Sequence, residues 1–440
     1  MSQGRSKVFF VVLISSLFLL LTALLIAGQL SNFDRNHAQS MLREVSADVE
    51  KHYYDPKLHG VDWQLRFHQA QQNIDTTDSM DGALTEIAAL LDSLNDSHTF
   101  LIPPKRNYIH DYGFTPQMVG EHCYITRVTA GSDAEKKGLK VGDEVIAIDG
   151  HRVSRKVLWK LLYLYDFLRP QPGLQVTLAD PSNHPQLVEV AAKIQPSEAI
   201  NYRLHNGINH MVREFTRASI LLHPRYVEKE DLIIIQIPAF DLSIVEVDDV
   251  IGKMRRHSAA ILDLRGNPGG FTDALDRMIG GMFENDVKVF DRVMRTKTEA
   301  MTAHGRRHDT FTGKFAVLID SESASASELF ARVVQLERRG FVIGDRSSGS
   351  VMEAEHYRHD FYFDSETYYY VSITNANLIM SDGASLEHVG VDPDIMILPT
   401  SQDLAGKRDP VLSRAAKLLG VQINPEDAGK MFPFQEPLEH

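Results

Sequence analysis

The pattern of apolar and polar positions changes character three times along the chain. Residues 41–49 and 83–91 place apolar side chains at the spacing of one helix face, which predicts helical structure from residue 32 to about 101. Pro103 and Pro104 then stop regular structure. We therefore expect a small N-terminal helical domain over residues 32–110.

Shorter alternating segments follow, and they predict a mixed module of strands and short helices over residues 111–196. Strand-like segments cover residues 119–128, 174–178 and 187–190. A short capped helix over residues 130–139 ends in a glycine, and residues 158–167 are a second helix candidate.

Continuous apolar runs alternate with helical patterns in the rest of the chain. The runs, which are typical of buried parallel strands, cover residues 232–237, 259–264, 315–319 and 340–343. The helix candidates between them cover residues 248–254, 273–282 and 329–336. This alternation predicts an α/β domain, for which we set the bounds 197–440.

The N-terminus resembles a membrane anchor. Arg5 and Lys7 precede residues 8–27, which carry no charge and match the roughly 20 residues of a membrane-spanning helix. A cleaved signal, which usually has a shorter apolar core and a small-x-small site, is the alternative. We therefore expect residues 1–31 to hold one transmembrane helix, with the body on the periplasmic, extracytoplasmic side of the cytoplasmic membrane.

Composition narrows the class of protein. The 440 residues suggest two or three domains, and the net charge of −13 does not favour a nucleic-acid partner. The single cysteine, Cys123, excludes an intramolecular disulfide and a cysteine-based zinc site. The 19 histidines form no His-Glu-x-x-His pattern, so we expect neither a metal nor an organic cofactor.

The strongest candidate for chemistry is the Ser-Ala-Ser-Ala-Ser-Glu run at residues 323–328. It lies between the apolar run 315–319 and an amphipathic segment at 329–334. A strand, a tight turn of small residues and a helix present a nucleophilic serine, and the first helix amides can bind an anion. The alternative interpretation is a serine-rich helix N-cap without chemistry.

A glycine loop supplies a second candidate. Asn-Pro-Gly-Gly at residues 267–270 follows the apolar run 259–264. Gly269 and Gly270 could turn two backbone amides toward one point, as an oxyanion hole requires. A plain strand-to-helix turn is the alternative.

The run Gly-Leu-Lys-Val-Gly-Asp-Glu-Val-Ile-Ala-Ile-Asp-Gly at residues 138–150 resembles a PDZ domain. Such domains bind extended peptides as an added strand and often capture a terminal carboxylate. The resemblance places the capture loop at Tyr112, Gly113 and Phe114. Pro116 removes one donor from this loop, so gating and the reading of internal extended segments stay open.

Four segments around this module resemble the tricorn and C-terminal processing peptidase family of serine peptidases. They are Asp-Ser-His-Thr at 96–99, the glycine loop, the serine run and residues 383–394, and the resemblance covers about residues 35–420. It implies an α/β peptidase core in which Ser325 is the nucleophile. The oxyanion hole would come from the amide of Ala326 and from Gly269, beside Gly270.

The general base separates two branches of this family. The C-terminal processing branch uses a lysine about 25 residues after the serine, but Ser350 stands there and no lysine lies between Lys314 and Lys407. We therefore favour the tricorn-like branch, in which a histidine before the PDZ domain is the base.

The residues that match this branch are Ser97, His98 and Glu387. An imidazole accepts and returns protons near neutral pH. Ser97 would hold its other nitrogen, and Glu387 would orient Ser97. The alternatives are a structural histidine at residue 98 and a turn residue at 387.

We therefore predict a membrane-anchored serine endopeptidase that cleaves extracytoplasmic proteins, with PDZ-assisted substrate presentation. Its partners would be protein or peptide substrates and the membrane, and its oligomeric state is open. The alternative is an inactive family member that serves as a PDZ-containing peptide-binding adaptor.

Overall fold

The computed structural model describes residues 30–179, 185–196, 223–361 and 367–432. The predicted membrane segment, residues 8–27, lies outside these ranges. Within them, no helix has the length and apolar character needed to cross a membrane.

Three helices form the N-terminal module: α2 (Asn32–His52), α3 (Trp63–Thr76) and α4 (Met80–Asp92), with a 3₁₀ turn η1 (Leu58–Gly60). The side chains of Ser31, Asp62 and Ser79 cap the three α-helices, as their residue types favour. The prediction of helix up to residue 101 is wrong at its end. Three consecutive buried apolar residues form strand β1 (Phe100–Ile102), which pairs with a distant strand, β18.

The helical module shares its hydrophobic core with the other two modules. Tyr369, Val371 and Ile373 of β18 belong to this core, and so do Tyr163 and Phe167 of the PDZ-like module. None of the three modules therefore has a fully separate core, and the domain bounds 32–110, 111–196 and 197–440 stay predictions.

The first and last strands of the PDZ-like module, β2 (Tyr108–Asp111) and β9 (Lys193–Pro196), pair with each other. Of the strand predicted over residues 119–128, residues 122–128 are confirmed as strand, while the chain turns at Gly120, where φ is +58°. The module contains the hairpin β3 (Phe114–Val119) and β4 (His122–Val128), and a sheet in the order β6 (His151–Arg152), β5 (Val145–Ile148), β7 (Gly173–Leu178), β8 (Gln186–Ala191). Its helices are α5 (Asp133–Lys136), α6 (Leu158–Tyr163) and the π-helical turn η2 (Leu164–Leu168).

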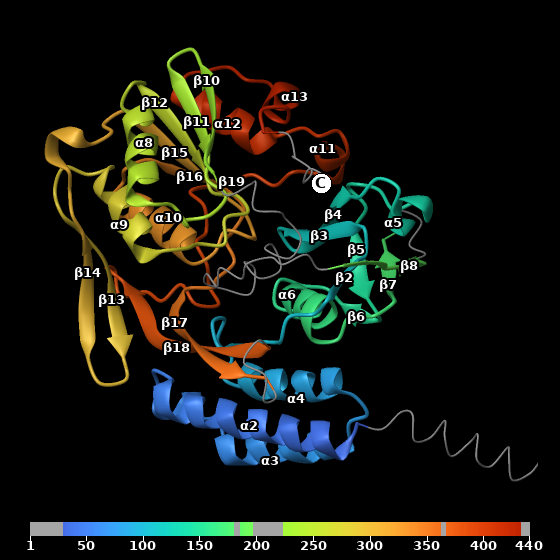
Figure 1. The fold of residues 1–440 in the computed structure, drawn as a ribbon. Helices are drawn as coiled ribbons and strands as arrows, with labels where there is room; N and C mark the ends of the chain where they lie inside the picture. The colour runs from blue at the N-terminus through green and yellow to red at the C-terminus, as the bar shows by residue number, and fades with distance from the viewer. Residues whose placement is uncertain (1–29, 180–184, 197–222, 362–366, 433–440) are drawn as a thin grey trace, which may run out of the picture.

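A six-stranded sheet forms the α/β core, with helices on both faces (Figure 1). Its order is β10 (Arg225–Lys229), β11 (Leu232–Gln236), β12 (Ala259–Asp263), β15 (Lys314–Ile319), β16 (Phe341–Gly344), β19 (Ile395–Met396). All neighbours are parallel except β10 and β11, so the four predicted parallel strands are confirmed.

The apolar runs are continuous because both faces of this sheet are covered. Along β11, Ile233 and Ile235 join one core cluster while Leu232 and Ile234 join the other. The helices on the first face are α8 (Ile244–Met254), α9 (Thr272–Gly280) and α10 (Ala326–Leu336), and those on the second are α12 (Pro410–Leu419) and α13 (Pro425–Ala428).

A second, five-stranded sheet was not predicted. Its order is β1, β18 (Tyr368–Met380), β13 (Val287–Met294), β14 (Thr298–Ala303), and β17 (Met352–Asp360) also pairs with β18. The chain also forms the short elements η4 (Arg307–Asp309) and α11 (Ser401–Ala405). Because β18 contacts β1, β17 and β13, this sheet joins the helical module to the core.

A buried ion network fixes the end of β12. Arg265 donates to both oxygens of the fully buried Asp263, at 2.9 and 2.7 Å, and to both oxygens of Asp409, at 3.0 and 2.7 Å. Asp409 also caps α12 through the N–H of Leu412. The network therefore ties the loop after β12 to a helix on the second face of the sheet.

Replacing Arg265 with Met should lower the free energy of unfolding by about 3 kcal/mol, because it leaves the Asp263 carboxylate buried without a cation. Urea unfolding of the full chain would measure this. The control is Arg277→Met, which removes a partly exposed ion pair with Asp248 and should cost less than about 1 kcal/mol. Equal losses in the two variants would contradict the role assigned to the network.

Candidate active site

The serine run forms a strained turn between β15 and α10. Ser325 directly precedes α10 and adopts φ 53° and ψ −118°, a conformation that side-chain-bearing residues rarely take. Its side chain is 8% exposed. The strand, turn and helix expected around residues 323–328 are therefore present, with Ser325 at the start of the helix.

The carboxylate of Glu328 holds this turn in place. The N–H of Ser325 donates to Glu328 Oε2 at 3.0 Å and to the carbonyl oxygen of Ser350 at 2.9 Å. Glu328 also accepts from Ser347 Oγ at 2.6 Å, Gly349 N at 2.7 Å and Ser350 N at 2.9 Å. Burial raises the pKa of Glu328 to about 7, and these hydrogen bonds oppose that rise.

The glycine loop lies directly against the serine turn. Gly269 has φ +105°, and a Cβ atom there would stand 2.6 Å from Ser325 Cβ and 3.0 Å from the nitrogen of Ala326. Only a glycine permits this approach. No acceptor for the N–H of Ala326 is present among the residues described, so this amide is available beside Ser325 Oγ.

The second predicted oxyanion donor is engaged elsewhere. The N–H of Gly269 donates to Oδ1 of Asn267 at 2.9 Å in this structure. Gly270 has φ +146° and forms a parallel bridge with Phe240, where a Cβ atom would come within 2.4 Å of the Phe240 backbone. The two glycines thus allow close backbone packing, and a direct role for either in anion binding stays a prediction.

The predicted histidine, serine and glutamate form a hydrogen-bonded chain. His98 Nδ1 lies 2.7 Å from Ser97 Oγ, and Ser97 Oγ donates to Glu387 Oε2 at 2.9 Å. Because the hydroxyl proton points to the carboxylate, Ser97 Oγ must accept from Nδ1–H. The Nε2 atom of His98 then carries the lone pair that a general base needs.

Two further contacts fix the carboxylate of Glu387. It accepts the N–H of Ser97 and the N–H of Val351, both at 2.8 Å. Burial raises the pKa of Glu387, and these donors oppose the rise.

A buried carboxylate shapes the turn that carries the histidine. Asp96 accepts the N–H of His98 at 2.8 Å, the N–H of Thr99 at 2.9 Å and Oγ1 of Thr374 at 2.7 Å. Ser372 Oγ donates to the carbonyl oxygen of His98 at 2.6 Å. The backbone of His98 is therefore held by β18 and by Asp96.

The Nε2 atom of His98 forms no hydrogen bond with Ser325 in this structure. His98 is 1% exposed, and its Nε2 atom has no hydrogen-bond partner within the described ranges. Burial lowers the pKa of His98 to about 4, so the imidazole is neutral at neutral pH. The structure thus assembles two half-sites: Ser97, His98 and Glu387 in one, and Ser325 with Ala326 in the other.

The segment 347–351 touches both half-sites, and the sequence did not identify it. Ser350 accepts from the N–H of Ser325, while the next residue, Val351, donates to Glu387. Ser350, which stands where the other branch has its lysine, contributes its backbone here. The signal for this segment was Glu328, which the sequence favours as a cap of its own helix: its carboxylate accepts the N–H of Ser325 as a cap does, and it also accepts from residues 347, 349 and 350.

The PDZ-like module contacts the same region. Arg155 donates to Asp345 Oδ2 at 2.5 Å and to the carbonyl oxygen of Arg346 at 3.0 Å, and Gly120 N donates to Asp345 Oδ2 at 2.8 Å. Asp345 directly follows β16 and leads into residues 347–351. The β3–β4 turn is therefore joined to the segment that links the half-sites.

The structure does not support the predicted capture loop. Tyr112 is buried in the module's core, and its hydroxyl accepts from Gln171 N at 3.0 Å. The N–H of Gly113 donates to Asp111 at 2.8 Å, and Phe114 pairs with Val128 in the β3–β4 hairpin. Tyr112 and Gly113 are committed to internal contacts, because they build the turn into β3.

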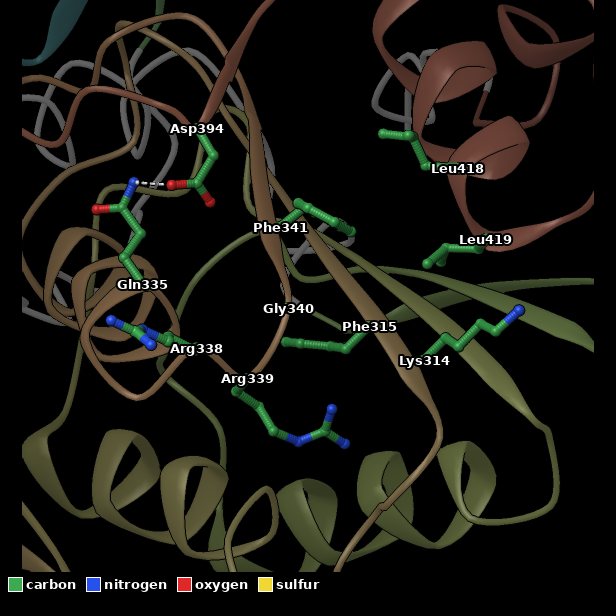
Figure 2. Close-up of a pocket in the computed structure, with 10 residues that line it drawn as sticks. All are labelled: Lys314, Phe315, Gln335, Arg338, Arg339, Gly340, Phe341, Asp394, Leu418 and Leu419. Carbon is green, nitrogen blue, oxygen red and sulfur yellow. Dashed lines mark hydrogen bonds between the residues drawn. The ribbon is translucent and has the colours of Figure 1, made fainter.

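A cavity of about 720 Å³ lies elsewhere on the core domain (Figure 2). Lys314 and Phe315 at the start of β15, and Phe341 at the start of β16, contribute to its wall together with Leu418 and Leu419 of α12. Ser325 follows the opposite end of β15, so this cavity is separate from the half-sites.

Replacing Glu328 with Gln should lower the free energy of unfolding by about 2 kcal/mol, because the amide group would turn an N–H toward backbone donors that now meet an oxygen. Urea unfolding would show the loss. Glu337→Gln, at the exposed far end of the same helix, is the control and should change the value by less than about 0.5 kcal/mol. An unchanged midpoint in Glu328→Gln would mean that the carboxylate does not organise the turn.

Comparison with known proteins gives a consistent family. Residues 231–397 match the model of peptidase family S41, and residues 105–177 match the PDZ domain. The carboxy-terminal processing protease CtpA of Bacillus subtilis is 24% identical over 410 residues, which cover 89% of this chain and 77% of that protein. The tail-specific protease of Haemophilus influenzae is 26% identical over 294 residues, 64% of this chain but only 40% of that protein.

A solved structure shares the fold at low identity. The crystal structure of mature CPAF has a TM-score of 0.61 and 14% identity, and the match covers 85% of this chain and 95% of that one. It supports the arrangement of the peptidase and PDZ modules as a fold. From these matches we conclude that residues 231–397 form a peptidase family S41 domain and residues 105–177 form a PDZ domain, in a chain that is similar to carboxy-terminal processing proteases.

Proposed function

We propose that the protein is a membrane-anchored serine endopeptidase that cleaves extracytoplasmic protein substrates, with Ser325 as nucleophile and His98 as base. One observation carries the proposal. The Glu387–Ser97–His98 chain leaves Nε2 as a neutral acceptor, in the same molecule that holds Ser325 in a strained turn at the start of α10. The membrane anchor rests on residues 8–27 alone.

The reaction would proceed by acyl transfer. Ser325 Oγ attacks the peptide carbonyl carbon while His98 Nε2 takes the hydroxyl proton. The N–H of Ala326, at the positive end of α10, stabilises the developing oxyanion. His98 then returns the proton to the leaving amine, and a water molecule repeats the sequence to release the acyl group from Ser325.

Residues Ser97 and Glu387 would support the charge that forms on His98. When Nε2 gains a proton, the imidazolium keeps donating through Nδ1 to Ser97, whose hydroxyl remains directed at the carboxylate. A negative charge two hydrogen bonds away favours the protonated state. This is the orienting role of the third member of a catalytic triad, with one serine inserted.

Catalysis requires His98 Nε2 to accept the proton of Ser325 Oγ, and within the described ranges Nε2 has no hydrogen-bond partner. The segment 347–351 connects the two half-sites, since its backbone contacts both Ser325 and Glu387. Arg155 meets this region through Asp345. We therefore propose that the PDZ domain presents substrate and favours the joined state through that contact.

The lack of a hydrogen bond between His98 Nε2 and Ser325 also favours a second candidate function. A family member whose His98 never reaches Ser325 would act as a PDZ-containing peptide-binding adaptor. An intact hydrogen-bonded chain behind His98 is the argument against it, because a binding protein gains nothing from an oriented Nε2 atom.

Labelling with a fluorophosphonate probe tests the proposal. We expect covalent attachment at Ser325, located by mass spectrometry, and its loss in both Ser325→Ala and His98→Ala. The control is His223→Ala, which removes an exposed histidine whose ring contacts Glu246. This variant should label like the unmodified chain.

Two other outcomes of this experiment would contradict the proposal. Labelling that survives His98→Ala would show that another group is the base. No labelling, even with peptides present, would favour the adaptor.

The pH dependence of labelling tests the environment of His98. Because burial lowers its pKa to about 4, Nε2 stays unprotonated well below pH 6.5. The labelling rate should therefore be flat from pH 8 to 6 and fall only as the pH drops toward that pKa. Tryptophan fluorescence at each pH would confirm that the chain is folded. A midpoint near 6.5 would show that the reacting imidazole is exposed to water.

A further inference from the structure

The outer edge of β14 is an unpaired strand edge. In the order β1, β18, β13, β14, strand β14 is last, and no strand in the described part of the chain pairs with its outer side (Figure 1). Thr298, Glu299, Ala300 and Thr302 are exposed. The edge is therefore accessible over five consecutive positions, 298–302, of which only Met301 is partly covered.

The register identifies the backbone groups that face outward. The N–H of Met294 donates to the carbonyl oxygen of Lys297 at 2.9 Å, so these two residues form a hydrogen-bonded pair. Such pairs alternate along an antiparallel ladder, which makes Arg292 with Glu299 the next one. Thr298 and Ala300, on either side of Glu299, belong to the non-hydrogen-bonded pairs of this ladder. Their N–H and C=O groups are therefore directed away from β13.

This edge lacks the features that usually prevent strand addition. Residues 298–303 contain no proline and no lysine, and their one charge is Glu299. Strand β10, at one edge of the six-stranded sheet, is different, because it carries Arg225, Glu228 and Lys229. An edge with three charges in five residues is better protected from pairing than an edge whose one charge is a carboxylate.

The hairpin that carries this edge is also held in position. Arg295, at its tip, donates to the carbonyl oxygen of Tyr53 in the helical module at 2.9 Å. Partly buried Met294 and Met301 pack against the main core. A strand that is already ordered loses little conformational entropy when another strand joins it.

We propose that a second copy of this chain pairs with β14 in antiparallel register about a two-fold axis at Ala300. Ala300 then faces its own equivalent, Thr298 faces Thr302 of the second copy, and Glu299 faces Met301 of the second copy. This register uses the outward groups of Thr298, Ala300 and Thr302 and opposes no like charges. A two-fold pairing of this kind closes and produces a dimer instead of a fibre.

Sedimentation of the full chain in a non-ionic detergent tests the proposal with two substitutions at one position. Ala300→Pro removes the outward N–H, which makes no bond to β13, and proline is tolerated at such edge positions. We expect a concentration-dependent dimer for the unmodified chain and for Ala300→Val, and a monomer for Ala300→Pro. Equal melting temperatures would show that the proline variant is folded.

Disulfide formation tests the register. A hydrogen-bonded antiparallel pair has Cα atoms about 5.5 Å apart, which lies within disulfide range. Ala300→Cys should therefore form a covalent dimer on mild oxidation, because Cys123 is buried. Thr296→Cys, at the exposed hairpin turn, is the control, and its equivalents would lie roughly eight residue spacings apart, so it should not cross-link.

Three results would overturn the proposal. They are a monomer at every concentration, a dimer that Ala300→Pro leaves unchanged, and equal cross-linking of the two cysteine variants. Loss of protein cleavage in Ala300→Pro without any change in mass would also overturn it, since the edge would then bind an extended substrate.

Discussion

The burial of one carboxylate, that of Glu328, is the interaction on which the rest of the site depends. A charge taken out of water is tolerated only when hydrogen bonds replace its hydration, and here four donors do so. One donor, the N–H of Ser325, lies on the nucleophile turn, and the other three lie on residues 347–350. The positive φ of Ser325, which costs roughly 1–3 kcal/mol, persists because this network surrounds it.

The histidine half-site shows the opposite electrostatic situation. His98 is buried, which favours its neutral form, and its Nε2 atom has no hydrogen-bond partner among the residues that the structure describes. An unmet buried acceptor costs about 1–3 kcal/mol. A hydroxyl that reached Nε2 would recover this energy, so under the proposed mechanism the resting state itself favours the approach of the serine.

Local pattern was sufficient for some parts of the structure. The four parallel strands could be predicted because burial on both faces makes their sequences continuously apolar. The contact of Ser97, His98 and Glu387 followed from the family resemblance, since 290 positions separate Ser97 from Glu387 and no local signal relates them.

Other parts depend on contacts that no local pattern encodes. The sheet containing β13, β14, β17 and β18 was missed because its strands are irregularly buried and carry many polar residues. Likewise, the use of the Gly269 amide by Asn267 and the internal bonding of Tyr112 are decided by single side chains. The linking segment 347–351 was missed because its function lies in backbone groups, which every residue possesses.

The shared core of the helical module limits how the PDZ domain can move. Tyr163 and Phe167 of the PDZ-like module belong to the same core cluster as the helices and β18, and both are almost fully buried. A wide hinge rotation would expose these rings to water at roughly 2 kcal/mol each. Rearrangement is therefore confined to shear, in which packed elements slide by small amounts while their interface stays dry. In such a molecule the position of the PDZ domain and the geometry around β18 change together, over distances smaller than the width of a side chain.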